Sequence, residues 1–147
     1  MKPFNIFVVI SFVLIVAGFI FFKDGFNKDK SSVAGQSELL MNTPGYLNYS
    51  DSRLVDSQKK GTSVLFFAAT KWCQTCILLE KEILERSAEI PKDTTILKVD
   101  YDNDKVMNQK YGVTSQHTLV VLDKNGKELK RWIGGYFDTL LQELEKT

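Results

Sequence analysis

The feature that most constrains the fold of this chain is a pair of closely spaced cysteines between a strand-like and a helix-like segment. The chain has two cysteines, Cys73 and Cys76. A continuous apolar run over residues 64–69 precedes them, and such a run is typical of a strand that is covered on both faces. Apolar residues at helical spacing follow, which predicts an amphipathic helix from Cys76 to the residue before Pro91. A strand with two covered faces implies helices on both sides of a sheet.

A cysteine at the start of that helix is chemically activated. Unpaired backbone N–H groups and the positive end of the helix dipole favour an anion at Cys73, and for a cysteine that anion is the thiolate. Thiols in Cys-X-X-Cys motifs at helix N-termini have pKa values about 1 to 5 units below the free value of about 8.5. One sulfur can therefore attack a disulfide at neutral pH, and the second, one turn further along, can resolve the product.

Three structural interpretations of the cysteine pair compete with the redox one. The two residues can form a structural disulfide, fill the core as two small apolar side chains, or supply half of a zinc site. A four-ligand zinc site needs two more Cys or His ligands. The chain has only one histidine, His117, so half a zinc site is disfavoured. A strand before the pair and a helix after it favour a redox motif.

The N-terminal region predicts a membrane segment. Residues 4–22 carry no charged side chain and, as a helix, would span about 28 Å, close to the hydrocarbon thickness of a bilayer. A cleaved signal peptide is the alternative, but the apolar run is longer than usual for one and no small-residue cleavage site follows it. We therefore predict a single-pass, uncleaved signal anchor over residues 1–22, a linker over residues 23–45 and one domain over residues 46–147.

The distribution of charge bears on orientation and on partners. The lysines on the two sides of the apolar run do not decide its orientation, and we expect the domain to be extracytoplasmic. From Tyr46 onward, Lys and Arg together equal Asp and Glu in number, so the domain carries no net charge. This balance does not indicate a nucleic-acid surface.

The rest of the domain alternates helices and strands. Within the helix after the cysteines, we expect Glu82 and Arg86 to form an i, i+4 ion pair. The hairpin predicted below makes the sheet mixed and four-stranded, so the fold class is α/β. The expected elements are a helix that Ser50 or Asp51 can cap and that stops at Lys59-Lys60-Gly61, strands over residues 62–69 and 94–100, a helix through Lys110 that Asp102-Asn103-Asp104 can cap, a hairpin of residues 118–122 and 127–133 around a turn of the Asn-Gly type at residues 123–126, and a final helix from Phe137 nearly to Thr147.

Several of these features together resemble the thioredoxin family. The resemblance covers residues 46–147 and implies a thioredoxin-like mixed sheet flanked by helices. It also implies that Cys73 is the exposed nucleophile and Cys76 the buried resolving thiol, with Trp72 at the lip of the site; a plain packing role for Trp72 is the alternative. The features are Trp72 before the cysteine pair, the apolar strand ahead of it, Tyr111-Gly112-Val113, the hairpin, Gly134-Gly135 and the terminal helix. The other residues expected around the cysteines are Gln74, Thr75, Gln116, His117 and Thr118.

Two positions near the motif depart from the thioredoxin pattern. The family carries a buried acid in the strand before the motif, which moves the proton of the resolving cysteine. Here that position is Phe66 or Phe67, depending on whether Lys71 is an insertion, and the acid is missing in either case. The pair between the cysteines, Gln74-Thr75, is neither Gly-Pro nor Pro-His, and this pair helps to set the redox potential in the family.

His117 is the third departure, because it stands where the family has a cis-proline. A cis bond before a non-proline residue costs about 2.5 to 4 kcal/mol, so we expect a trans Gln116–His117 bond. The resemblance implies that the imidazole lies against Cys73, where a protonated ring would stabilise the thiolate and a neutral ring could carry its proton. The same geometry would make Cys73, Cys76 and His117 three soft ligands for copper or zinc.

Taken with the resemblance, the sequence predicts a membrane-tethered thiol:disulfide oxidoreductase that exchanges disulfides with protein partners, without a cofactor or a resident metal. Because the chain has no second redox centre, we expect a separate redox partner. Whether it oxidises, reduces or isomerises depends on its reduction potential relative to the compartment. One alternative is a copper-handling protein that uses Cys73, Cys76 and His117, although such thioredoxin-fold proteins usually have a wider cysteine spacing. The other alternative is a redox-inactive scaffold.

Overall fold

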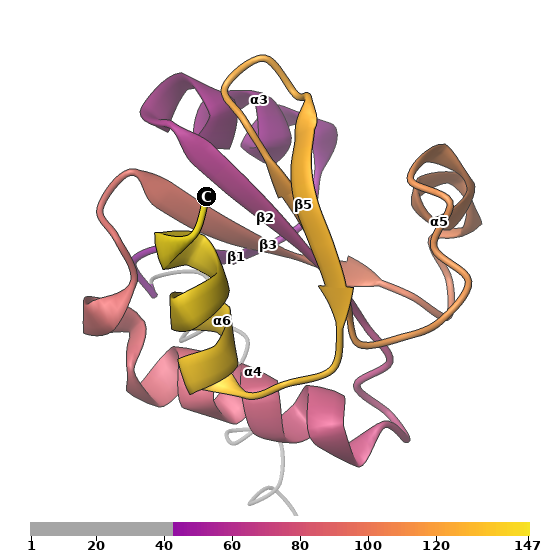
Figure 1. The fold of residues 1–147 in the computed structure, drawn as a ribbon. Helices are drawn as coiled ribbons and strands as arrows, with labels where there is room; N and C mark the ends of the chain where they lie inside the picture. The colour runs from indigo at the N-terminus through magenta and orange to yellow at the C-terminus, as the bar shows by residue number, and fades with distance from the viewer. Residues whose placement is uncertain (1–42) are drawn as a thin grey trace, which may run out of the picture. The chain divides into compact units, whose positions relative to one another are not determined.

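The computed structural model describes residues 43–147 (Figure 1). The predicted anchor over residues 4–22 and nearly all of the predicted linker lie outside the described residues. Within residues 43–147, no helix combines the length and the apolar character needed to cross a bilayer. The fold described below is therefore that of the predicted C-terminal domain.

The elements follow the order that the sequence predicts, apart from an additional strand at the start and a short 3-10 helix after the helix that carries the cysteines. The elements are β1 (Tyr46–Asn48), α3 (Asp51–Lys60), β2 (Thr62–Ala68), α4 (Gln74–Glu85), the 3-10 helix η1 (Ser87–Glu89), β3 (Thr94–Asp100), α5 (Lys105–Lys110), β4 (Thr118–Leu122), β5 (Glu128–Ile133) and α6 (Phe137–Glu145). Of the capping candidates in the sequence, Ser50 and Asp104 accept the backbone hydrogen bonds at the starts of α3 and α5.

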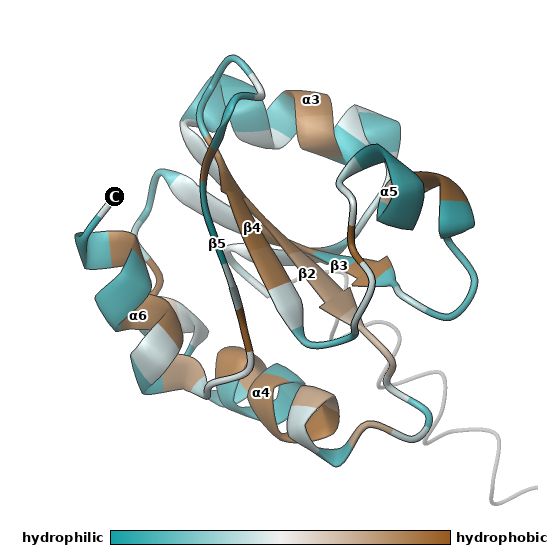
Figure 2. Ribbon diagram, turned by 45° about the vertical axis from the view of Figure 1, so that its right-hand side comes forward, coloured by the Kyte–Doolittle hydropathy of each residue, from teal (hydrophilic) through white to brown (hydrophobic). Residues whose placement is uncertain are grey.

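The strands form one mixed sheet in the order β1-β3-β2-β4-β5. The first three strands in this order are parallel, whereas β4 runs antiparallel to β2 and β5 runs antiparallel to β4. β2 therefore lies in the centre of the sheet, and every residue in it after Thr62 is buried. This position explains its continuous apolar sequence, which Figure 2 shows together with that of β4.

Helices cover both faces of the sheet, and each face has its own apolar cluster (Figures 1 and 2). On the face covered by α4 and α6, Cys76 and Phe137 pack in one cluster with Phe66. On the face covered by α3 and α5, Met107 packs in a second cluster with Phe67. Successive strand residues point to opposite faces, so the two adjacent phenylalanines of β2 belong to different clusters. The cysteines therefore lie on the face of Phe66.

Residues 43–147 contain five strands where the sequence predicted four. The additional strand, β1, is three residues long. It pairs with β3 in the register Tyr46↔Ile96 and buries the side chain of Tyr46 completely. This strand depends on pairing with a segment far along the chain, and so short a sequence does not show a strand pattern of its own.

The helix after the cysteines is shorter than predicted. α4 ends at Glu85, because Arg86 leaves the helical conformation with φ of −114° and ψ of 20°. The chain then continues as η1 through Glu89. The predicted pair between Glu82 and Arg86 does not form, since both side chains bind elsewhere.

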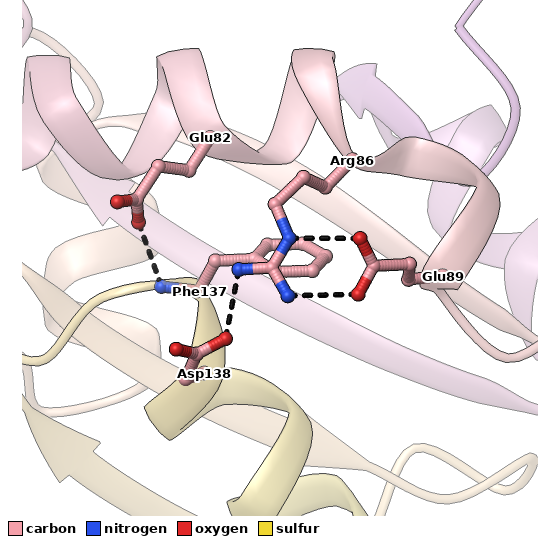
Figure 3. Close-up of polar contacts among 5 residues, drawn as sticks. All are labelled: Glu82, Arg86, Glu89, Phe137 and Asp138. Carbon is pink, nitrogen blue, oxygen red and sulfur yellow. Dashed lines mark hydrogen bonds and ion pairs between the residues drawn. The ribbon is translucent and has the colours of Figure 1, made fainter.

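Glu82 and Arg86 instead hold α6 against α4 (Figure 3). Glu82 Oε2 accepts a hydrogen bond of 2.9 Å from the backbone N–H of Phe137, and this bond caps α6, whose own N-cap side chain makes none. Arg86 donates to both carboxylate oxygens of Glu89, at 2.8 and 2.7 Å, and to Asp138 at 2.7 Å. Its guanidinium carbon lies 4.5 Å from the centroid of the Phe137 ring. These contacts place the terminal helix beside the helix that carries the cysteines.

The predicted turn between β4 and β5 forms, but with a bulge. The backbone N–H of Asp123 donates to the Lys127 carbonyl at 2.9 Å, and the Asp123 carboxylate accepts from the N–H of Asn125 at 2.8 Å. Gly126 has φ of 80°, whereas Asn125 has no positive φ. The loop is therefore not a two-residue Asn-Gly turn, in which both central residues need a positive φ.

Candidate active site

The two cysteines lie at the N-terminus of α4, as predicted, and a disulfide joins them. Cys73 is the N-cap residue, and its Sγ accepts a hydrogen bond of 3.2 Å from the backbone N–H of Cys76. The same sulfur lies 3.3 Å from the hydroxyl oxygen of Thr75. After reduction, this N–H, this hydroxyl and the helix dipole can all stabilise a negative charge on Cys73 Sγ.

Cys73 is the more accessible cysteine, although it is more buried than the resemblance implied. Its exposed fraction is 7%, and that of Cys76 is 0%. The Cys73 side chain turns back over the first turn of its own helix to accept the Cys76 N–H, and both residues belong to the apolar cluster under α4. A sulfur atom of a partner can therefore approach Cys73 but not Cys76.

Trp72, the residue before the pair, projects from the core. Its exposed fraction is 54%, and its indole Nε1 donates a hydrogen bond of 3.0 Å to the Asp102 carboxylate. This bond fixes the orientation of the ring without burying it. Such exposure does not fit the plain packing role that was the alternative, and it agrees with a place at the lip of the site. Gln74 and Thr75 are exposed beside it.

A loop before β4 brings His117 to the disulfide. The ligand atoms of Cys73, Cys76 and His117 all lie within 4.8 Å of one another. The Gln116–His117 bond is trans, as expected, and no peptide bond in residues 43–147 is cis. His117 has φ of 60°, in the left-handed region, and it is the only non-glycine residue in the described part of the chain with a positive φ. Such a conformation is strained for a residue with a Cβ atom.

Two backbone hydrogen bonds hold His117 in this conformation. Its N–H donates to the Phe67 carbonyl in β2 at 2.9 Å, and its carbonyl accepts from the N–H of Gly134 at 2.8 Å. Gly134 has φ of 79°, which glycine adopts without strain. On the two sides of His117, Gln116 is half-buried and the buried Thr118 donates its hydroxyl to the Ser115 carbonyl at 2.7 Å. The loop is therefore tied both to the central strand and to the end of β5.

The imidazole of His117 lies in an apolar environment. Its exposed fraction is 4%, and it meets the Phe66 ring edge to face with 5.5 Å between centroids. Neither ring nitrogen makes a hydrogen bond with another described residue. Burial lowers the pKa of His117 below its usual value of 6.5, and the backbone of Gly135, which is near the ring but makes no geometrically acceptable hydrogen bond to it, offsets this in part. The ring is therefore neutral at neutral pH. Of the two expected roles, a neutral ring fits transfer of a cysteine proton, whereas stabilisation of the thiolate would need a protonated ring.

The structure resolves which phenylalanine replaces the family's buried acid. Phe66 lies in the same apolar cluster as the two cysteines, whereas Phe67 lies on the other face of the sheet. The acid position is therefore Phe66, and Lys71 counts as the insertion. A phenyl ring cannot exchange a proton, so any proton transfer at Cys76 must use another group.

A charged network that the sequence analysis missed lies beside Phe66. In the sheet, Lys98 of β3 is the register partner of Phe66, and its ammonium group pairs with the Glu80 carboxylate of α4. The hydroxyl of Tyr46 donates to Glu80 Oε1 at 2.9 Å. Burial, and then the charge of Glu80, raises the pKa of Tyr46. Glu80 follows Cys76 by four positions, so helical spacing was the signal in the sequence.

Exposed apolar side chains come from the segments that carry the site. They are Trp72, Ile133 and Tyr136. Ile133 is the register partner of Thr118, and Tyr136 follows the two glycines at the end of β5. Exposed aromatic and aliphatic side chains of this kind are frequent in surfaces that bind other proteins.

Comparison with known proteins identifies the family. Residues 48–146 match the family model described as Thioredoxin. The chain belongs to the thioredoxin family. The thioredoxin of Chlamydia trachomatis is 36% identical over 85 residues, which cover 58% of this chain and 80% of that protein. The thioredoxin of Mycoplasma genitalium is 38% identical over 78 residues, which cover 53% of this chain and 72% of that protein.

Solved thioredoxin structures share the fold. The thioredoxin of Trypanosoma brucei brucei superposes with a TM-score of 0.59 at 26% identity, covering 72% of this chain and 93% of that chain. A thioredoxin of Nicotiana alata superposes with a TM-score of 0.55 at 31% identity, covering 66% of this chain and 86% of that chain. This member of the thioredoxin family is therefore a disulfide oxidoreductase, and Cys73 and Cys76 form its Cys-X-X-Cys pair.

Proposed function

We propose that this protein is a membrane-tethered oxidoreductase that exchanges disulfides with protein partners, with Cys73 as the attacking and Cys76 as the resolving cysteine. The observation that carries this assignment is the placement of the disulfide at the N-terminus of α4. Cys73 is the sulfur that receives the helix N–H and that a partner can reach, whereas Cys76 is fully buried.

The exchange proceeds through two displacements. In the reduced protein, the Cys73 thiolate attacks one sulfur of a partner disulfide, and the second partner sulfur leaves as a thiolate that takes up a proton. Cys76 then loses its proton and attacks Cys73 Sγ. This step forms the Cys73–Cys76 disulfide and releases the first partner sulfur as a thiolate. Oxidation of a partner dithiol follows the same steps in reverse.

His117 is the group best placed to move the proton of Cys76. A ring nitrogen lies within 4.8 Å of the cysteine sulfurs, and burial lowers the pKa of His117, which keeps the ring neutral and able to accept a proton. Phe66 occupies the position of the family's acid and cannot do so. The imidazolium that forms would lie beside Cys73 Sγ, where its charge favours departure of the partner's sulfur from Cys73 as a thiolate.

The surface around the disulfide suits a protein partner. Trp72 precedes Cys73, and Ile133 and Tyr136 flank the glycine pair whose first member binds the His117 loop; all three side chains are exposed and apolar. A second redox protein must restore the starting state of Cys73 and Cys76 after each cycle, because the chain contains no other cysteine. The direction of net exchange follows from the reduction potentials of these partners.

Trapping tests the assignment of the two cysteines. Cys76→Ser removes the resolving sulfur, so mixed disulfides through Cys73 should accumulate and give a ladder of adducts on non-reducing gels of membrane extracts. Cys73→Ser is the matched control, because it leaves only the fully buried sulfur. Adducts from Cys73→Ser and none from Cys76→Ser would reverse the two roles.

The tether is proposed from the uncharged sequence of residues 4–22. We expect the full chain to stay in the membrane fraction after a carbonate wash, and a variant without residues 4–22 to be released. Because the domain is proposed to be extracytoplasmic, protease added outside intact cells should digest it. If the wild-type protein is instead released from the membrane fraction with a new N-terminus close to Gly25, the segment is a cleaved signal peptide.

A further inference from the structure

We propose that the reduced protein binds one monovalent copper ion, Cu(I), between Cys73 Sγ, Cys76 Sγ and a ring nitrogen of His117. This inference uses the same residues as the exchange reaction but does not depend on it. It rests on the distances between the three ligand atoms, on the buried His117 nitrogens without hydrogen-bond partners, and on the metal preference of two sulfur ligands and one nitrogen ligand.

The three side chains are close enough to share one ion. Their ligand atoms lie within 4.8 Å of one another. With bonds of about 2.0 to 2.3 Å to nitrogen and sulfur, three ligands around one ion lie about 3.5 to 4 Å apart. Breaking the disulfide lets Cys73 Sγ and Cys76 Sγ separate to that distance, and His117 needs only a small shift toward them.

The His117 ring points to a ligand because its nitrogens are unsatisfied. The residue is 4% exposed, and neither ring nitrogen has a hydrogen-bond partner among the described residues. Buried polar atoms are normally paired. The backbone is nevertheless held in a strained conformation, with φ of 60°, by hydrogen bonds to Phe67 and Gly134. A metal ion between the ring and the two sulfurs would satisfy one of these nitrogens.

The donor set favours monovalent copper. Thiolate sulfur is a soft ligand that selects Cu(I) or zinc, and imidazole binds both metals. A structural zinc site takes four protein ligands, whereas Cu(I) is stable with three. Within residues 43–147, Cys73, Cys76 and His117 are the only His, Cys, Asp or Glu side chains clustered closely enough, in a group of three or more, to hold an ion. The helix N–H at Cys76 can stabilise the net negative charge of two thiolates and one Cu(I).

Copper binding and the disulfide exclude each other, because both use the same two sulfurs. Reduction of the disulfide by an added phosphine supplies two electrons and yields two thiols. Binding of Cu(I) then displaces the two thiol protons and transfers no electron. Copper should therefore bind only the reduced form, and bound copper should stop disulfide exchange.

A competition titration of the full-length protein in mild detergent tests the proposal. The protein is reduced with a phosphine without oxygen, freed of the reductant, and titrated with Cu(I) against the chromogenic chelator bicinchoninate. We expect one tightly held ion per reduced chain and none in the oxidised protein. His117→Asn keeps a residue that tolerates a positive φ but removes the imidazole, and it should weaken binding by at least about tenfold. Gln109→Ala, on the exposed surface of α5, is the control and should bind as the wild type does.

X-ray absorption of the copper-loaded wild type gives a readout that does not depend on any variant. Two sulfur atoms and one nitrogen atom should surround the copper. An unchanged affinity in His117→Asn, or a copper shell without nitrogen, would overturn the site. Displacement of copper by an equal amount of zinc would overturn the choice of metal. Copper-free disulfide exchange, assayed on the same samples, tests the proposed function separately, so the two failures are distinguishable.

Discussion

Replacing His117 with proline, the residue that thioredoxins have at this position, should destabilise this protein rather than restore a family-like loop. Proline fixes φ near −65°, whereas residue 117 has φ of 60°. Proline also lacks the N–H that donates to the Phe67 carbonyl at 2.9 Å. The loop would have to rearrange while still bound to β5 through Gly134.

His117→Gly is the matched reference for the magnitude. Both variants lose the buried imidazole, so that loss cancels between them. Glycine keeps the N–H and accepts a positive φ, and it relieves strain of about 1 to 2 kcal/mol. In the proline variant, the Phe67 carbonyl loses its donor, at a cost of about 1 to 3 kcal/mol, and the backbone conformation is forbidden. We expect His117→Pro to be less stable than His117→Gly by about 3 kcal/mol or more.

Urea denaturation of the oxidised proteins, followed by tryptophan fluorescence, measures this difference. The urea midpoints should differ at an unchanged m-value, because the surface exposed on unfolding is nearly the same. A proline variant as stable as the glycine variant would refute the reasoning. It would mean that the loop accepts the family's proline and that the hydrogen bond to Phe67 does not determine its conformation.

Three other perturbations have defined outcomes. The pKa of His117 is lower in the folded than in the unfolded protein, so the unfolded chain takes up the proton first as the pH falls. The free energy of unfolding of the oxidised protein should therefore decrease below about pH 6.5, by at most about 1.4 kcal/mol per pH unit. Urea titrations should show no such decrease in His117→Asn. Glu82→Ala removes the acceptor of the Phe137 N–H and should cost about 1 kcal/mol in the same titrations, whereas Glu85→Ala at the exposed end of α4 should cost less. Iodoacetamide should alkylate Cys73 before Cys76 in the reduced protein, as peptide mass spectrometry would show, and the reverse order would contradict the accessibility of the two sulfurs.

Local sequence was sufficient to predict the elements whose ends and burial depend on neighbouring residues. Ser50 and Gly61 bound α3, because a capping hydroxyl and a glycine stop act within one turn. The apolar run of β2 predicts a central strand, because burial on both faces requires it. The position of Cys73 at the start of α4 follows from the strand before it and the helical spacing after it.

Features that depend on distant residues could not be predicted from the sequence. β1 is three residues long and exists because β3 pairs with it. Helical spacing predicts an ion pair between Glu82 and Arg86. The backbone N–H of Phe137 at the start of α6 donates to the Glu82 carboxylate instead. The left-handed backbone of His117 likewise depends on hydrogen bonds to Phe67 in β2 and to Gly134 after β5. The residues next to His117 in the sequence do not indicate these bonds.

The two departures from the thioredoxin pattern at Phe66 and His117 are linked by contact. Their rings pack edge to face at 5.5 Å, so Phe66 contributes to the burial that keeps the imidazole neutral. A carboxylate at position 66 would stabilise the protonated ring and would also pair with Lys98, its register partner in β3. With phenylalanine at position 66, the ammonium group of Lys98 forms its ion pair with Glu80 of α4. Phe66 therefore leaves the central strand without a proton acceptor on this face, whereas the imidazole that we propose as the acceptor lies in the loop before β4, and Glu80 is the partner of Lys98.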